Sequence, residues 1–190
     1  MTSSAYDVAA LAARQEISDV IHRYCHAIDR RRWWLMETVF HEDATYKFTA
    51  IEGGWRHFVA EARRLVDPLA VTHHQVSNIL VALDGDVAHT ETYLTAYHLV
   101  PADYPTDLAF PGTGQAYEVV TGGRYVDRFE RRNGVWKIAH RTGLFDWRRD
   151  QPLADGGLSE APADWRGQHG DLDPFRSVAA RWRSPAAAEA

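Results

Sequence analysis

The chain has 190 residues, of which 45% are hydrophobic and 25% are charged, a composition typical of one soluble globular domain with a sizeable core. Its formal net charge of −5 argues against nucleic acid or an anionic membrane surface as the main partner. The single cysteine, Cys25, excludes an internal disulfide and a thiolate metal cluster. No signal peptide and no apolar run of about 20 residues is evident, so we expect a soluble, cytoplasmic protein.

Helical periodicity dominates the first third of the chain. Apolar residues spaced three and four apart are typical of amphipathic helices, whereas alternation of apolar and polar residues indicates a strand. In order, the pattern predicts a helix over 8–28, a short helix over 33–40, a strand over 43–48 and a third helix over 55–66. The run Arg30–Arg32 is expected to form a solvated corner, and Gly53-Gly54 to end the first strand.

From Val71 onward the period changes to two. We expect strands over 73–83, 87–99, 117–130 and 135–147. Asp84-Gly85-Asp86 and Asn133-Gly134 are tight hairpin signals, so the strands that flank them should pair as antiparallel neighbours. Helices followed by antiparallel strands indicate an α+β fold. We expect a curved antiparallel sheet and N-terminal helices to enclose a cone-shaped cavity, all within residues 1–150.

Residues 151–190 differ from the rest in composition. They are rich in Pro, Gly, Asp and Ala, yet they retain three large aromatic side chains. Because such a segment is seldom entirely disordered, we expect this C-terminal extension to pack over the domain or over a neighbouring subunit. Asp173-Pro174 is a start signal for a short helix over 176–182, and the last residues should fray.

One predicted strand carries the residues on which the functional interpretation depends. Alternation places His74 on one face of it, together with Val76, Asn78 and Leu80. Asp29 ends the preceding helix, and a carboxylate bonded to one imidazole nitrogen fixes the tautomer and raises the basicity of the other nitrogen. Such a pair can abstract a proton from carbon in a dry pocket. Taken singly, Asp29 also fits a helix-end turn and His74 a hydrogen-bonded core histidine.

Other candidate residues leave two interpretations open. Tyr24 could donate a hydrogen bond or a proton to a leaving oxygen, or it could pack in the core. Strict alternation places Arg141 on the exposed face of the last strand unless a β-bulge intervenes. His22 and His26 have a spacing that suits metal ligands on a helix, but no third ligand is evident, and we expect no metal site.

Aromatic residues are numerous, with seven Trp, eight Tyr and seven Phe. They fit both core or subunit packing and the walls of a pocket for a flat apolar ligand. Our candidate substrate-binding residues are Trp33, Tyr46, Asn78, Tyr93, Tyr97 and Tyr125.

Four segments carry a resemblance to a known family: RYCHAID at 23–29, FHEDA at 40–44, THHQVSN at 72–78 and GGRYVDRFERRNGVWKI at 122–138. Together they resemble the SnoaL-like branch of the nuclear transport factor 2 superfamily, over roughly residues 15–147. The resemblance implies the cone-shaped, cystatin-like fold of that family. Its members γ-hexachlorocyclohexane dehydrochlorinase, scytalone dehydratase and bile-acid 7α-dehydratase use an Asp–His pair that removes a proton while a neighbouring group departs.

The resemblance also assigns roles to residues. Asp29 matches the aspartate of the pair, and His74 matches the histidine because only His74 has the His-x-x-x-Asn spacing. Tyr24 matches an active-site tyrosine, and Tyr46 falls where these relatives have an aromatic pocket wall. Arg141 matches an active-site arginine, in conflict with strict alternation. A lysine of the dehydrochlorinase has no clear counterpart here, which argues against dehydrochlorination itself.

We therefore expect a cofactor-independent lyase that acts on a small hydrophobic cyclic or aromatic substrate. The reaction would be a dehydratase-type elimination, and C–C cleavage would use the same groups. One alternative is a ketosteroid-isomerase-like isomerase or a polyketide cyclase, and another is a ligand-binding module without catalysis. The resemblance further implies a homo-oligomer, with a trimer favoured over a dimer.

Overall fold

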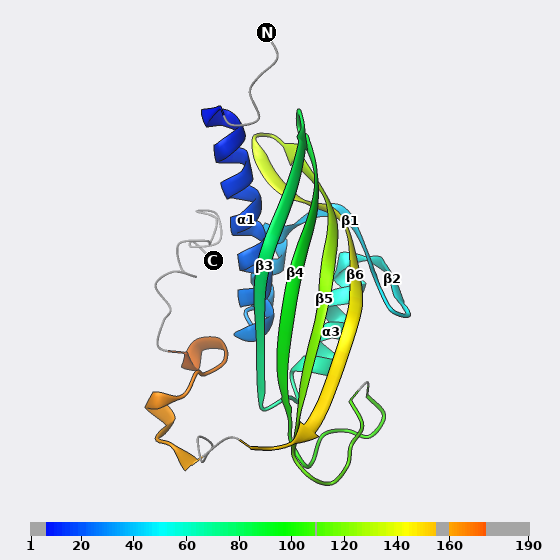
Figure 1. The fold of residues 1–190 in the computed structure, drawn as a ribbon, viewed down its shortest axis with the longest axis vertical. Helices are drawn as coiled ribbons and strands as arrows, with labels where there is room; N and C mark the ends of the chain where they lie inside the picture. Colours follow the sequence, from blue (N-terminus) through cyan, green and yellow to red (C-terminus); the bar gives the residue numbers. More distant parts are fainter. Residues whose placement is uncertain (1–6, 109, 155–159, 174–190) are drawn as a thin grey trace.

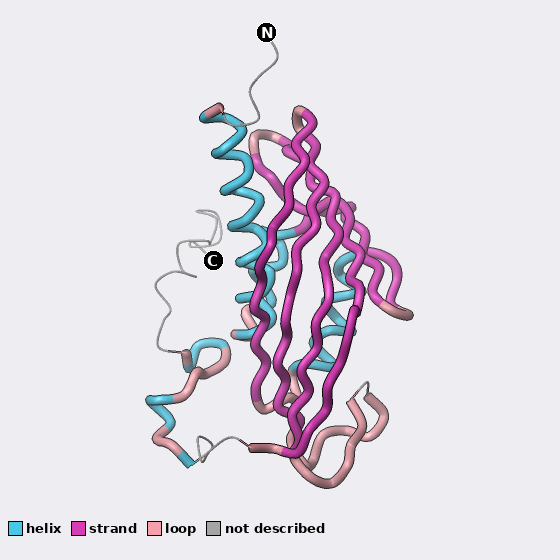
Figure 2. The backbone as a smooth tube through the Cα atoms, in the orientation of Figure 1, coloured by secondary structure: helices cyan, strands magenta, loops and turns pink. Residues whose placement is uncertain are grey.

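The computed structural model describes residues 7–108, 110–154 and 160–173, and its largest element is a curved six-stranded sheet of order β2-β1-β6-β5-β4-β3 (Figure 1). The helices gather on one side of this sheet (Figure 2). The strands are β1 (Phe40–Phe48), β2 (Ile51–Gly54), β3 (Val71–Asp84), β4 (Val87–Val100), β5 (Tyr117–Arg132) and β6 (Val135–Pro152). The helices are α1 (Val8–Asp29), α2 (Met36–Val39) and α3 (Trp55–Val66), with short 3₁₀ turns η1 (Trp33–Leu35), η3 (Ala163–Trp165) and η4 (Gly170–Leu172).

The predicted α+β fold is confirmed, but the edges of the sheet differ from the prediction. β1 begins at Phe40 rather than Asp43 and pairs in parallel with β6. Gly53-Gly54 do not end a strand but form part of β2. β6 continues beyond Trp147 to Pro152. The residues after Trp147 are mostly charged, so the apolar pattern gave no sign of a strand there, although their backbone pairs with β5.

Local chemistry explains the ends of the main elements. Asp7 caps α1, because its carboxylate accepts a 2.7 Å hydrogen bond from the Ala10 amide. Both predicted hairpins are confirmed. Gly85 (φ +58°) turns β3 into β4, and Asn133 and Gly134 (φ +52° and +78°) turn β5 into β6. Positive φ at both central residues suits a type I′ turn, as at Asn133-Gly134, and positive φ at the first alone suits a type II′ turn, as at Gly85; both follow the twist of the sheet.

Three β-bulges interrupt β3 and β6, and two of them change the face of residues singled out from the sequence. In β3, Asn78 is an extra residue with φ +45°, between Ser77 and Ile79, which pair with consecutive residues of β4. Ile79 therefore turns inward, and the expectation that Asn78 and Leu80 share a face with His74 is wrong. In β6, Ala139 is the extra residue between Ile138 and His140. The bulge buries Arg141 completely, so the exposure that strict alternation predicted is also wrong.

The turn after α1 is not the solvated corner that its three arginines suggested. Arg32 is 5% exposed, and its amide donates to the Ala27 carbonyl at 2.8 Å. Arg31 has a left-handed backbone (φ +51°), and its guanidinium donates to the Leu69 and Val66 carbonyls in the segment that leads into β3. The turn thus ties the end of α1 to the start of the strand that carries His74.

Within the C-terminal extension, the described segment 160–173 reaches the C-terminal end of α1 with its last residues (Figure 1), where Gly167 and Gly170 lie against Arg30. The Gly170 amide donates to the Arg30 carbonyl at 2.7 Å. The short helix expected over 176–182 and the frayed end lie outside the described residues. None of the described helices is both long and apolar enough to span a membrane.

Candidate active site

Asp29 and His74 meet where the C-terminal end of α1 packs against β3. Asp29 Oδ1 lies 2.6 Å from His74 Nδ1, and Asp29 Oδ2 accepts a 2.7 Å hydrogen bond from the His74 amide. The His74 and Asp29 side chains are only 10% and 9% exposed. A carboxylate that accepts from Nδ1–H holds the proton of the neutral ring at Nδ1, so Nε2 keeps its lone pair. This geometry suits a base and a carboxylate that orients it.

The His74 ring lines a cavity of about 230 Å³, whereas Asp29 lies behind the ring. This volume is just below the range of about 300–1,000 Å³ that is usual for drug-sized ligands, so a small ligand fits best. The walls are mainly apolar and come from α1, α3, the sheet and the loop between β4 and β5: Ile28, Phe48, Ile51, Phe58, Ala62, Leu65, Val66, Leu94, Ala96, Phe110, Leu144 and Phe145. Low polarity around an imidazole strengthens its electrostatic interactions with a bound ligand.

Two tyrosines line this cavity as a hydrogen-bonded pair. Tyr24 from α1 and Tyr46 from β1 both line it, and their hydroxyl oxygens are 3.0 Å apart. Burial raises the pKa of Tyr24, although Arg141 opposes the shift, and burial raises the pKa of Tyr46 well above its usual range. Both phenols therefore remain protonated at neutral pH. One proton serves the bond between them, which leaves the other available to a ligand oxygen.

Arg141 lies behind these rings rather than in the cavity lining. Its guanidinium forms two 2.7 Å hydrogen bonds with the Asp127 carboxylate, and both side chains are fully buried. Its central carbon lies 4.1 Å from the ring centroids of both Tyr24 and Tyr125, which is cation–π geometry. Among the described residues, Arg141 Nη1 has no hydrogen-bond partner. Arg141 thus places a buried positive charge against the rings of Tyr24 and Tyr125.

His98 is a cavity residue that the sequence interpretation missed. Its ring centroid lies 5.6 Å from that of His74, and its Nδ1 lies 3.1 Å from the Thr72 hydroxyl. Burial, followed by the neighbouring His74, lowers the pKa of His98 to about 3, so the ring is neutral. The signal was present in the sequence, because alternation along β4 places His98 with Leu94 and Ala96 on the apolar face.

The remaining sequence candidates divide into two groups. Tyr46 and Tyr125 are buried and line the cavity. The other four lie outside its lining: Trp33, whose indole N–H donates to Asp67; Asn78, at the exposed bulge; and Tyr93 and Tyr97, on the outer sheet face. Alternation along β4 already places Tyr93 and Tyr97 outward, because each lies an odd number of positions from Leu94 and Ala96, which face inward.

The histidines at metal-ligand spacing on α1 do not converge on a common site. His22 is exposed, and His26 Nε2 lies 2.9 Å from Arg32 Nη1. Within the described residues, no group of three or more His, Cys, Asp or Glu side chains is placed to bind a metal ion.

Comparison with known proteins identifies similar sequences and folds. The profile of the SnoaL-like domain matches residues 9–142. Rv2910c, an uncharacterized protein of Mycobacterium tuberculosis, is 27% identical over 142 residues, which cover 73% of this chain and 89% of that protein. Mb2934c of Mycobacterium bovis, also uncharacterized, matches with the same figures.

Solved structures with similar folds share little sequence identity with this chain. A hexachlorocyclohexane dehydrochlorinase (LinA) type 2 aligns with a TM-score of 0.64 at 18% identity, covering 77% of this chain and 96% of that one. Kfla4162 from Kribbella flavida aligns with a TM-score of 0.62 at 20% identity, covering 80% of this chain and 99% of that one. A scytalone dehydratase-like protein from Novosphingobium aromaticivorans aligns with a TM-score of 0.60 at 17% identity, covering 76% of this chain and 91% of that one. At such identities these likenesses establish the fold.

Proposed function

The chain belongs to the family of SnoaL-like domains, in the nuclear transport factor 2-like superfamily, and on that basis we propose that it is a cofactor-independent lyase. The observation that carries the proposal is the pairing of Asp29 with His74 at the wall of an apolar cavity. The dehydrochlorinase and the scytalone dehydratase-like protein among the structural neighbours lend support, because both names denote eliminations.

In the proposed reaction His74 Nε2 removes a proton from a carbon of the substrate. The electron pair of the C–H bond forms a new C=C bond, and a group on the adjacent carbon departs with its own bonding pair. Asp29 stabilises the imidazolium that forms, and general-base help of this kind contributes about 10²–10⁴ in rate. Apart from the substrate, the step needs only side chains of this chain.

The tyrosine pair suits the departing group. A protonated phenol from Tyr24 or Tyr46 would transfer its proton to a leaving oxygen, so that a hydroxyl departs as water and a phenolate remains. Arg141, whose charge lies against the Tyr24 ring, would stabilise that phenolate until it regains a proton from the His74 imidazolium by way of solvent. A preorganised donor in a dry site contributes about 10²–10³ in rate. The apolar walls and small volume point to a hydrophobic cyclic or aromatic substrate of one or two rings.

The test begins with a panel of small cyclic compounds, each with a leaving group next to an acidic C–H bond. Ligands that raise the melting temperature are then incubated with the protein, and the products are weighed by mass spectrometry. We expect loss of water or another small group, abolished in His74→Ala and strongly reduced in Asp29→Asn. His73→Ala is the matched control, since His73 is the exposed neighbour on the opposite face of β3.

Each alternative outcome has a distinct meaning. Full activity in His74→Ala would refute the proposed base. A product of unchanged mass would identify an isomerase or cyclase that uses the same base. Tight binding without any product, in wild type and variants alike, would identify a ligand-binding module.

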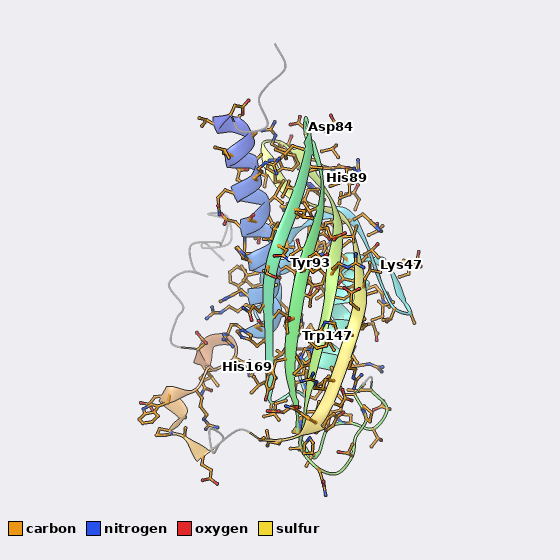
Figure 3. The ribbon with its side chains drawn as sticks, viewed as in Figure 1. Lys47, Asp84, His89, Tyr93, Trp147 and His169 are labelled. Carbon is orange, nitrogen blue, oxygen red and sulfur yellow. The ribbon has the colours of Figure 1, made fainter. Side chains whose placement is uncertain are left out.

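A homo-oligomer, with a trimer favoured, is part of the same proposal. The outer face of the sheet supports it, because that face exposes the large side chains of Leu80, Tyr93, Val126 and Trp147. Figure 3 shows Tyr93 and Trp147 on the side of the sheet away from α3.

A further inference from the structure

The C-terminal segment 160–173 makes its polar contacts with the turn that follows Asp29. Asp173 Oδ2 lies 3.5 Å from Arg30 Nε, and Asp173 Oδ1 lies 4.0 Å from Arg32 Nη2. Asp173 and Arg32 are each 5% exposed and the Arg30 side chain is 29% exposed, so the carboxylate of this cluster is buried and one of its two cations is half-buried. The backbone of Gly170 adds two hydrogen bonds. Its amide donates to the Arg30 carbonyl at 2.7 Å, and the Gly170 carbonyl accepts from Arg32 Nη2 at 3.4 Å.

These contacts reach the catalytic carboxylate in one step. Arg30, which pairs with Asp173, also donates from Nη1 to the Asp29 carbonyl at 3.3 Å. Asp29 is the last residue of α1, so the turn after it sets the position of its carboxylate. Both carboxylate oxygens are engaged by His74, at Nδ1 and at the amide, and a small rotation of the turn would break at least one bond.

Charge balance gives Asp173 a second effect. Arg30 and Arg32 both pair with Asp173, and without it both guanidinium groups would lose that carboxylate partner. A cation that has lost its partner acts more strongly on other anions nearby, and Asp29 is next to Arg30 in the chain. The same cluster acts on His169, whose pKa is lowered by burial, Arg31 and Arg30, while Asp173 and Asp29 act in the opposite direction. Figure 3 shows His169 where the segment meets the end of α1.

We propose that Asp173 is a positioning residue for the Asp29–His74 pair: the C-terminal segment clamps the Arg30–Arg32 turn and keeps the Asp29 carboxylate on the imidazole. The inference deepens the proposed function and rests on it for its catalytic meaning, but the geometry can be tested without a substrate. The clamp belongs to the catalytic unit, although it lies far along the chain from the residues that it positions.

The test is the proton NMR signal of His74 Nδ1–H, which a 2.6 Å bond to a carboxylate shifts downfield of other imidazole protons. We expect this signal in the full-length wild-type protein and its absence in Asp29→Asn and His74→Ala, which assign it. Asp173→Asn should shift the signal upfield or broaden it beyond detection, and Asp173→Glu should restore it. Asp164→Asn is the matched control, because Asp164 is an exposed carboxylate of the same segment and should leave the signal unchanged.

A folded Asp173→Asn protein with an unchanged signal would overturn the inference. If that variant does not fold, Gly170→Ala decides, since Gly170 has φ +58° and an added Cβ meets no atom within 4 Å. The alanine disfavours this left-handed backbone without a steric clash, so it should weaken the contacts of Gly170 with Arg30 and Arg32. It should perturb the His74 signal, and an unchanged signal there would equally refute the proposal.

Activity gives a second readout once a substrate is known. Misplacing a catalytic group by about 1 Å can cost about 100-fold in rate, so we expect kcat of Asp173→Asn to fall about tenfold or more with KM nearly unchanged. An equal rise in KM with kcat intact would contradict positioning of the base. If no substrate is turned over while the NMR signal still depends on Asp173, the lyase proposal fails and the clamp stands.

Discussion

Arg141 and Asp127 bury opposite charges next to the rings of Tyr24 and Tyr125, and this arrangement makes each charge depend on the other. Both side chains are 0% exposed and share two hydrogen bonds. Such a pair is stable only as a unit, because each charge alone would pay its full desolvation cost in the core. The pair therefore fixes a positive charge near the cavity without exposing it to solvent.

Removing one member of this pair should be strongly destabilising. In Asp127→Asn the Arg141 charge is buried without a counter-ion, and we expect the free energy of unfolding to fall by about 3–5 kcal/mol. Urea denaturation followed by circular dichroism measures the change. Asp146→Asn is the control, because Asp146 pairs with Arg124 at the surface and its loss should cost far less. Equal effects in the two variants would contradict the account of Arg141 as a buried cation.

His98 should make stability depend on acidity. Burial and His74 lower the pKa of folded His98 from 6.5 to about 3, although Asp29 opposes the shift. Above about pH 6.5 the ring is neutral in both states; as the pH falls toward 3, only the unfolded chain takes up the proton, so the folded state loses stability. At pH 3 the wild type should therefore have lost on the order of 3–5 kcal/mol more of its free energy of unfolding than His98→Gln, which lacks this group. Denaturation curves across this range measure it, with exposed His73→Gln as the control, and parallel curves for wild type and His98→Gln would contradict it.

At the scale of elements, the sequence predicted the helices and turns, whose conformations depend on residues that are neighbours in the chain. Helical periodicity located α1 and α3, and Gly85 and Asn133-Gly134 located the hairpins, because the turn residues themselves determine those conformations. Asp29 and His74 could be paired through the family resemblance. The positions of Asn78 and Arg141 could not be read from alternation, since a bulge is visible only once the partner strand is known.

The bulge in β3 can be tested at Asn78 itself. Its backbone is left-handed (φ +45°), which asparagine tolerates and a β-branched residue does not. Asn78→Val should lower the free energy of unfolding by about 1–2 kcal/mol, while Asn78→Gly should be neutral or slightly stabilising. Thermal and urea denaturation compare the two variants. A valine as stable as the glycine would mean that the strand pairs without a bulge in solution.

At the scale of the whole molecule, the two faces of the sheet have different roles. The inner face supplies the cavity, where His74, His98 and Thr121 accompany apolar walls. The outer face exposes four large apolar side chains, Leu80, Tyr93, Val126 and Trp147, across neighbouring strands β3 to β6. This outer patch surrounds the ion pairs of Arg124 with Glu91 and Asp146. A chain that uses one sheet face for a ligand has the other free for contact between subunits.

Trp147 makes this outer patch a rigid surface. It pairs with Gly122 across the β5–β6 ladder, where a Cβ would lie 2.1 Å from the indole nitrogen. Glycine therefore lets the ring lie flat over β5, although Trp147 remains 49% exposed. A large aromatic ring held in one position presents contact area at low entropic cost, as in protein interfaces.

Charges in this patch should separate the subunits. We expect wild-type protein to sediment as a trimer or a dimer, and Tyr93→Glu/Trp147→Glu to sediment as a monomer, because burying two unpaired carboxylates in an interface is costly. Analytical ultracentrifugation measures the mass. Val135→Glu is the control, since Val135 is equally apolar and 52% exposed but lies at the β5–β6 turn. Both substituted side chains point away from the cavity, so the downfield His74 signal should survive in the monomer. A variant that keeps the wild-type mass would show that subunits do not meet at this face.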